Sequence, residues 1–301
     1  MASGDAKSII IWPDGTVVVP DLADGLHTLA DVTPLPWQLG RHARVDLAQR
    51  AAQARELLGP TCRLCARGCA VDRRHGQRGF CGLGDSVAWA EPTLLWGEEP
   101  ELGRPGLALA PLGCGLRCVF CYRPELLRPA DSRPLPSFDS SQAAHLHLLG
   151  GNPDESLPFV LEMLAARQDP LPVVWNTHAY VMPEAATLLE GVVDAVVADL
   201  KFGPGACAGE LAGVADYWSR ATAALALWSR LDLDLLVRHV ALPGHIDCCA
   251  RPVAAWMAEH LPDITFRILD QYEPWGRAWH RPGLDRRLSD AERAALATLK
   301  G

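Results

Sequence analysis

Six short apolar runs, each followed by polar residues or glycine, recur along the chain from residue 107 onward. They lie near residues 107–112, 145–149, 171–175, 192–198, 234–240 and 264–269. Helical spacing of apolar positions lies between most of them, at Glu155–Arg167, Pro183–Glu190, Glu210–Arg230 and Ala250–Leu261. This alternation predicts an α/β fold with a parallel sheet. Periodicity alone fits both a barrel and a doubly wound open sheet.

The connection after the first run departs from this pattern. Residues 122–149, 28 positions between Cys121 and Gly150, carry four prolines: Pro124, Pro129, Pro134 and Pro136. Because proline interrupts helices, we expect the first helix to be shortened or broken.

The chain before residue 59 does not show the repeated alternation of strand and helix patterns. "SIIIWPDGTVVVPDL" predicts a small hairpin around Asp14 and Gly15, and "DLAQRAAQARELL" predicts a helix. We therefore expect an N-terminal extension (1–58), a cysteine-rich segment (59–90) and a main α/β domain (91–301).

Composition is that of an ordinary globular protein. The 301 residues are 49% hydrophobic and 21% charged, which is enough for one large core with a small appendage. The start of the chain lacks the features of a secretory signal, and no run approaches the roughly 18 apolar residues of a membrane span. We expect a cytoplasmic protein with no membrane contact. The net charge of −8 argues against a broad phosphate-binding surface, so we do not expect a nucleic-acid partner.

The number and spacing of the cysteines indicate metal binding. Seven of the ten cysteines fall between Cys62 and Cys121, too many at tight spacings for a reducing compartment without metal ligation. The remaining three, Cys207, Cys248 and Cys249, are interpreted as small buried thiols.

The first cysteine set has the spacing C-x2-C-x3-C-x11-C. Four thiolates can close a site around zinc or hold an iron–sulfur cluster, and the spacing leaves both open. The segment has little apolar periodicity, so we expect it to need its metal to fold. Nearby arginines either offset thiolate charge or form a solvated basic loop. The set consists of Cys62, Cys65, Cys69 and Cys81, and the arginines are Arg63, Arg67, Arg73, Arg74 and Arg78.

The second set, Cys114, Cys118 and Cys121, has the spacing C-x3-C-x2-C and no obvious fourth protein ligand. Three thiolates on a cubane leave one iron open to a small molecule. With Phe120 before the last cysteine, this loop resembles the cluster loop of the radical S-adenosylmethionine (radical SAM) superfamily.

The resemblance extends along the chain. From about Cys62 onward, the sequence is similar to uncharacterised relatives of the pyruvate formate-lyase activating enzyme that carry an upstream four-cysteine segment. Matching stretches are "GEEP" before the cluster loop, then "LLGGNPDESLP", "VWNTHAYVMPE", "VVADLKFG", "LVRHVALPGHIDCCARPV" and "ILDQYEPWGRA". The resemblance implies a partial (βα)6 TIM-like barrel with chemistry at the carboxyl ends of its strands.

The resemblance also implies roles for individual residues. The cluster loop would hold a [4Fe-4S] cluster whose open iron binds S-adenosylmethionine. Asn152 replaces a family glutamate, and Asn176 replaces an aspartate that helps bind a monovalent cation in the activating enzymes. Asp199 and Lys201 also fit a plain surface ion pair. The residues implied to contact the cofactor are Phe120, Gly150, Gly151, Asn152, Asn176, Thr177, Asp199, Lys201 and Arg238.

The implied reaction is reductive cleavage of S-adenosylmethionine to a 5′-deoxyadenosyl radical, which abstracts hydrogen from a substrate. A flavodoxin or ferredoxin would supply the electron. The substrate is either a glycine of a partner glycyl radical enzyme or a small molecule or peptide. A metal-stabilised binding or scaffold protein without radical chemistry is the alternative. We expect Asp270, Gln271 and Tyr272 near substrate and no catalytic role for His239 or His245.

Overall fold

The computed structural model describes residues 10–11, 17–18, 40–96, 99–102, 105–129, 131–167 and 171–299. One seven-stranded sheet forms its centre, in the order β3-β4-β5-β6-β7-β8-β9. The strands are β3 (Thr93–Leu95), β4 (Gly106–Leu109), β5 (His145–Leu148), β6 (Val173–Thr177), β7 (Ala195–Asp199), β8 (Asp234–Val240) and β9 (Thr265–Leu269). All neighbouring pairs from β4 to β9 are parallel, whereas β3 pairs antiparallel with β4.

Sequential strand order decides between the two predicted architectures. A doubly wound sheet reverses its order at a switch point, and β4 to β9 show no reversal. The sheet is an open, partial (βα)6 TIM-like barrel with β3 added at one edge. The six predicted strands are confirmed, with boundaries shifted by a few residues, and β3 was not predicted.

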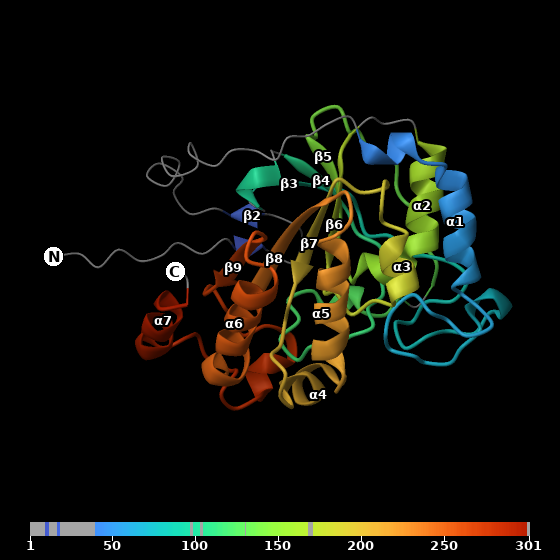
Figure 1. The fold of residues 1–301 in the computed structure, drawn as a ribbon. Coiled ribbons are helices and arrows are strands. Elements are labelled where there is room, and N and C mark those ends of the chain that lie inside the picture. Colours follow the sequence, from blue (N-terminus) through green and yellow to red (C-terminus); the bar gives the residue numbers. More distant parts are fainter. Residues whose placement is uncertain are drawn as a thin grey trace.

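Helices cover the outer face of the sheet (Figure 1). The predicted helix over Glu210–Arg230 is two helices, because Gly213 takes a left-handed φ of 72° and ends the first one. The helices are α1 (Leu47–Glu56), α2 (Leu157–Ala166), α3 (Pro183–Thr187), α4 (Cys207–Ala212), α5 (Tyr217–Trp228), α6 (Arg251–His260) and α7 (Asp290–Ala297). No helix among the described residues is both long and apolar enough to cross a membrane.

The expected break after the cluster loop is confirmed. Among described residues 122–129 and 131–144, the only helical element is the short 3₁₀ turn Pro124–Leu126. The described part of the first crossover therefore has no α-helix. In the N-terminal extension, β1 (Ile10–Ile11) pairs antiparallel with β2 (Val17–Val18), as the hairpin prediction requires, and its turn at Asp14 and Gly15 lies outside the described residues.

Alternating side chains give the sheet two faces. Val173 and Trp175 of β6 pack outward with the helices in the main core. Val174, between them, packs in a separate small cluster with Val197 of β7 and Leu236 of β8. Leu102, from the 3₁₀ turn Pro100–Leu102 (η4), joins this cluster, so the segment before β4 fills the concave face.

The four-cysteine segment packs on the barrel. Cys65 forms an isolated bridge with Val181, and the Ala66 N–H donates to the Tyr180 carbonyl at 3.2 Å. Above it, α1 lies beside α2 (Figure 1), joined by Arg55 and Glu162. The expected segment 59–90 is thus fixed to the loop after β6 and to the cluster loop.

Candidate metal and cofactor site

The cluster loop follows β4 at the carboxyl edge of the parallel strands. Cys114 is buried, and Cys118 and Cys121 are partly buried. Burial raises the pKa of each thiol, that of Cys118 to about 12, and the other cysteines of the loop act on Cys114 in the same direction. Buried thiols of this kind need a cation to ionise, which is what a bound metal cluster provides. The donor set fits an iron–sulfur cluster.

Phe120, next to Cys121, is partly buried. Its ring makes edge contacts with Phe202 at 5.9 Å and with Tyr272 at 6.5 Å between centroids. Tyr272, expected near substrate, is buried and donates to the Leu284 carbonyl at 2.8 Å. These contacts fix the loop against the segments that follow β7 and β9.

Gly150 and Gly151 contact the start of the cluster loop. A Cβ on Gly151 would lie 2.3 Å from the Gly113 carbonyl oxygen, and one on Gly150 would lie 2.7 Å from that of Pro111. The φ of Gly150 is 114°, which also favours glycine. Close approach of the cluster loop therefore accounts for both glycines. Their predicted role toward S-adenosylmethionine stays a prediction.

Asn152 and Thr177 belong to a buried polar network under the loop. The Asn152 side-chain nitrogen donates to Glu155 at 2.5 Å and to Asp154 at 3.0 Å, and its oxygen accepts from the His178 N–H at 3.2 Å. The Thr177 hydroxyl donates to Asp154 at 2.5 Å. Both predicted cofactor contacts are thus engaged within the protein.

Glu155 connects this network to both cysteine sets. Its Oε1 accepts from the Gly115 N–H at 2.6 Å, and donor atoms of Glu155, Cys114 and His178 lie within 4.8 Å of one another. A Cβ on Gly115 would meet Glu155 Oε1 at 2.6 Å and Cys65 Sγ at 3.2 Å. One buried carboxylate therefore lies between the upstream segment and the cluster loop.

A second polar network lies on the concave face. Arg238 of β8 donates to Asp199 at 2.9 Å, to Glu99 at 3.1 Å and to Asn176 at 3.2 Å. Lys201 Nζ donates to Asp199 at 2.9 Å. Burial raises the pKa of Asp199, but the two cations outweigh it and hold that pKa below the usual range. The structure brings together these four predicted residues, and the pair of Asp199 and Lys201 is largely buried, so the surface-pair interpretation is wrong.

The upstream set is less closely spaced than a single ion requires. Burial raises the pKa of Cys65, and that of Cys81 to about 11. No three sulfurs of this set lie within 4.8 Å of one another, whereas tetrahedral zinc places its sulfurs about 3.8 Å apart. Of the five arginines, Arg73 is buried, with Nη1 4.0 Å from Cys62 Sγ and 2.8 Å from the Glu155 carbonyl oxygen.

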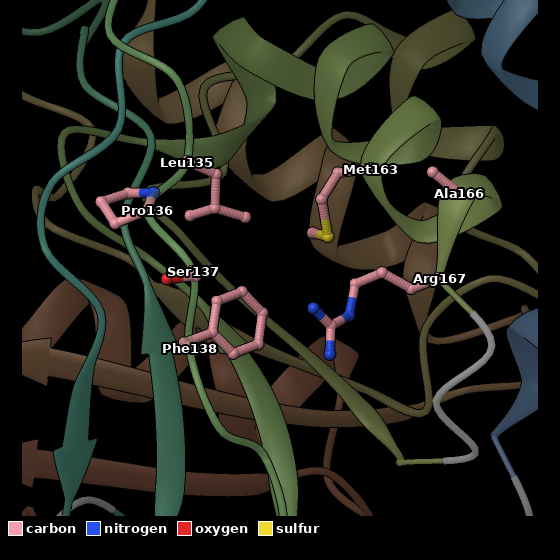
Figure 2. A pocket seen from close by; sticks show the side chains of 7 residues that line it. All are labelled: Leu135, Pro136, Ser137, Phe138, Met163, Ala166 and Arg167. Atoms are coloured by element: carbon pink, nitrogen blue, oxygen red, sulfur yellow. The ribbon is translucent and has the colours of Figure 1, made fainter.

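A surface hollow of about 350 Å³ lies away from both networks. Figure 2 shows its two walls, with Phe138 and Arg167 pointing toward each other. The Arg167 guanidinium lies 4.1 Å from the Phe138 ring centroid. The hollow contains no cysteine or acid, and we assign it no part in the site.

Comparison with known proteins finds relatives of limited similarity. No protein-family model matches the chain. The uncharacterized protein MJ0674 of Methanocaldococcus jannaschii is 28% identical over 246 residues, which cover 77% of this chain and 71% of that protein. Among solved structures, SuiB of Streptococcus suis is 15% identical with a TM-score of 0.41, over 63% of this chain and 43% of SuiB.

Two further SuiB structures, bound to precursor peptide SuiA and to S-adenosylmethionine, give the same TM-score of 0.41 and identity of 15%. They match 62% of this chain and 42% and 43% of SuiB, respectively. The chain spans less than half the length of SuiB.

Sequence reasoning missed several residues of the site. Glu99 belongs to "GEEP", and Asp154 and Glu155 belong to "NPDES", and the sequence predicted no role for any of the three. Acidic residues next to a strand end were the feature of the sequence that could have indicated these site residues. His147 of β5 was also missed, although its Nε2 lies 3.3 Å from Asn176 Nδ2.

Proposed function

We propose that this protein is a radical SAM enzyme, an oxidoreductase whose [4Fe-4S] cluster is held by Cys114, Cys118 and Cys121. The observation that carries the proposal is the position of the three thiols. They occupy one loop after the first parallel strand of a singly wound sheet, at the edge where such folds place their chemistry. When bound, the cluster supplies the electron that cleaves S-adenosylmethionine and starts hydrogen abstraction.

The concave network supplies the proposed contacts to the methionyl and ribose parts. Asn176, Asp199, Lys201 and Arg238 are close together and combine donors with acceptors. Burial raises the pKa of Cys118, and the charge of Lys201 lowers it. The ammonium group of Lys201 therefore acts on a thiol of the cluster loop. We propose that this ammonium group partly balances the thiolate charge.

For the upstream set, we propose an iron–sulfur cluster rather than zinc, because its sulfurs are spaced too widely for a single ion. Such a cluster would relay electrons to the first one. Iron analysis of anaerobically reconstituted protein tests this: about eight irons per chain support two clusters, and about four contradict the second.

Exposed aromatic residues beside the cluster loop support a protein partner. Tyr122, next to Cys121, is 55% exposed, and Trp275 and Trp279 are 42% and 60% exposed. Gly276 joins these two regions, since its Cβ would lie 2.8 Å from the Cys121 carbonyl oxygen. We propose that an electron donor such as flavodoxin or ferredoxin, or a protein substrate, binds this surface in the cytoplasm.

The substrate is proposed as either a glycine of a glycyl radical enzyme or a small molecule or peptide. Incubation with candidate glycyl partners separates these classes. An organic radical on the partner, seen by electron paramagnetic resonance, supports the first. Deuterium transfer from a labelled small molecule into 5′-deoxyadenosine supports the second.

A binding or scaffold protein is the second candidate, because Arg238 and Asn152 already bond to protein groups where cofactor contacts are proposed. The two functions differ in one measurement. The enzyme makes 5′-deoxyadenosine from S-adenosylmethionine under reducing conditions, above a Cys118→Ala control, and the scaffold does not.

A further inference from the structure

Three cysteines and a histidine gather outside both predicted sets. Cys207 begins α4, in the connection that follows β7, and His245, Cys248 and Cys249 lie in the turn that follows β8. Because β7 and β8 are parallel neighbours, these two connections leave the same edge of the sheet side by side. The interpretation of these three residues as small buried thiols is wrong for Cys248, which is exposed.

The distances between their donor atoms suit a single metal ion. Cys207 Sγ lies 3.3 Å from His245 Nδ1 and 3.4 Å from Cys248 Sγ, and Cys248 Sγ lies 3.4 Å from the same nitrogen. Cys249 completes a group whose donor atoms are all within 4.8 Å of one another. Tetrahedral zinc, with Zn–S of about 2.3 Å and Zn–N of about 2.0–2.1 Å, separates sulfurs by about 3.8 Å and sulfur from nitrogen by about 3.5 Å.

The backbone around the group brings the four side chains together. A wide π-helical turn, Ile246–Ala250 (η7), returns the Cys249 N–H to the His245 carbonyl at 3.0 Å. At Gly203, a Cβ would lie 2.3 Å from the Cys248 carbonyl oxygen, so only glycine lets the two connections meet.

We propose that Cys207, His245, Cys248 and Cys249 bind one Zn²⁺ through three sulfurs and the Nδ1 atom of His245. Binding releases the thiol protons to solvent and transfers no electrons. Four protein ligands leave no open position, so the ion is structural. The assignment of this zinc site does not rest on the proposed enzymatic function.

The zinc site would hold the helix that supports the cluster loop. Leu211 and Ala212, at the end of α4, accept from the Val119 N–H at 2.8 Å and the Arg117 N–H at 3.2 Å. Fixing Cys207, the first residue of that helix, to the turn after β8 therefore stabilises the loop that contains Cys118.

Zinc content of the full-length protein, purified anaerobically with zinc supplied, tests the proposal. We expect Cys207→Ser/Cys248→Ser to contain about one zinc per chain less than wild type. His245→Ala should lose the same ion, and His245→Cys should keep it, which separates ligation from misfolding. Unchanged zinc content in the folded double variant overturns the proposal.

Thiol labelling of the wild-type protein gives a second test that needs no variant. Cys248 is exposed, so we expect rapid alkylation after a chelator removes zinc and several-fold slower alkylation once zinc is restored. The control Cys62→Ser/Cys65→Ser should keep this protection. Protection removed by reductant and not by chelator indicates a disulfide between Cys207 and Cys248 and overturns the proposal.

Discussion

Arg238 Nη1 donates to Glu99 Oε1 at 3.1 Å, so a strand residue of β8 is paired with the segment before β4. Glu99 also pairs with Arg267 of β9. The guanidinium predicted to contact S-adenosylmethionine thus already holds a carboxylate of the protein. Binding of S-adenosylmethionine at this guanidinium would compete with closure of the concave face for the same donors.

The first prediction concerns Arg238→Gln. Removing this cation leaves Glu99 paired only with Arg267 and Asp199 paired only with Lys201, so we expect the free energy of unfolding to fall by about 1–3 kcal/mol. Arg220→Gln breaks an exposed pair with Asp216 and should cost no more than about 1 kcal/mol. Urea unfolding measures both variants. Equal losses would contradict the buried network.

A second prediction uses two glycines. Gly151→Ala places a methyl group against the Gly113 backbone, so we expect a loss of about 1–3 kcal/mol and weaker iron retention as the cluster loop is displaced. Gly205→Ala meets nothing within 4 Å and should leave stability nearly unchanged. Thermal unfolding and iron content check the pair. Retention of iron by Gly151→Ala at the wild-type level would show that the loop does not depend on this contact.

The sequence predicted the strands and most helices because each buried strand is a short apolar run that ends in polar residues. The periodicity of the sequence did not distinguish a barrel from a doubly wound sheet, because strand order depends on pairing between distant segments. The antiparallel strand β3 was missed because its three residues, Thr93–Leu95, are too few to show a pattern.

The site was predicted unevenly for the same physical reason. Cysteine spacing within one loop is local and was visible in the sequence. The contacts of Glu99 with Arg238, and of Cys207 with Cys248, join residues far apart in the chain and depend on the fold. Roles implied by the resemblance, such as that of Asn152, stay predictions.

A third prediction concerns Glu155. Glu155→Ala leaves the Gly115 N–H and the Asn152 side-chain amide without this acceptor, each at a cost of about 1–3 kcal/mol. Glu155→Gln keeps one oxygen for Gly115, so we expect a smaller loss of stability and of bound iron. Chemical unfolding and iron content measure the order of the two variants. A larger loss of stability and iron in Glu155→Gln than in Glu155→Ala would refute the role of Glu155 as a link between the two cysteine segments.

A fourth prediction concerns pH. Burial lowers the pKa of His239 to about 4, and its Nδ1 lies 2.7 Å from the Leu200 carbonyl oxygen. Between about pH 6.5 and 4 the unfolded chain binds a proton that the folded protein does not, so this residue lowers stability as pH falls. His239→Asn keeps the donor and does not titrate. We expect its stability to decline by about 2–3 kcal/mol less than wild type between pH 7 and 4.5. Urea unfolding at the two pH values measures this difference. An equal decline in the free energy of unfolding for wild type and His239→Asn would be inconsistent with a buried neutral histidine.

The central claim is that Cys114, Cys118 and Cys121 hold a cluster that reductively cleaves S-adenosylmethionine. Its most direct test is the amount of 5′-deoxyadenosine formed by anaerobically reconstituted protein with S-adenosylmethionine and a strong reductant, compared with Cys118→Ala. We expect reductant-dependent 5′-deoxyadenosine from the wild type and none above background from the variant. A folded, iron-loaded wild-type protein that forms no more product than Cys118→Ala would contradict it and favour the scaffold function.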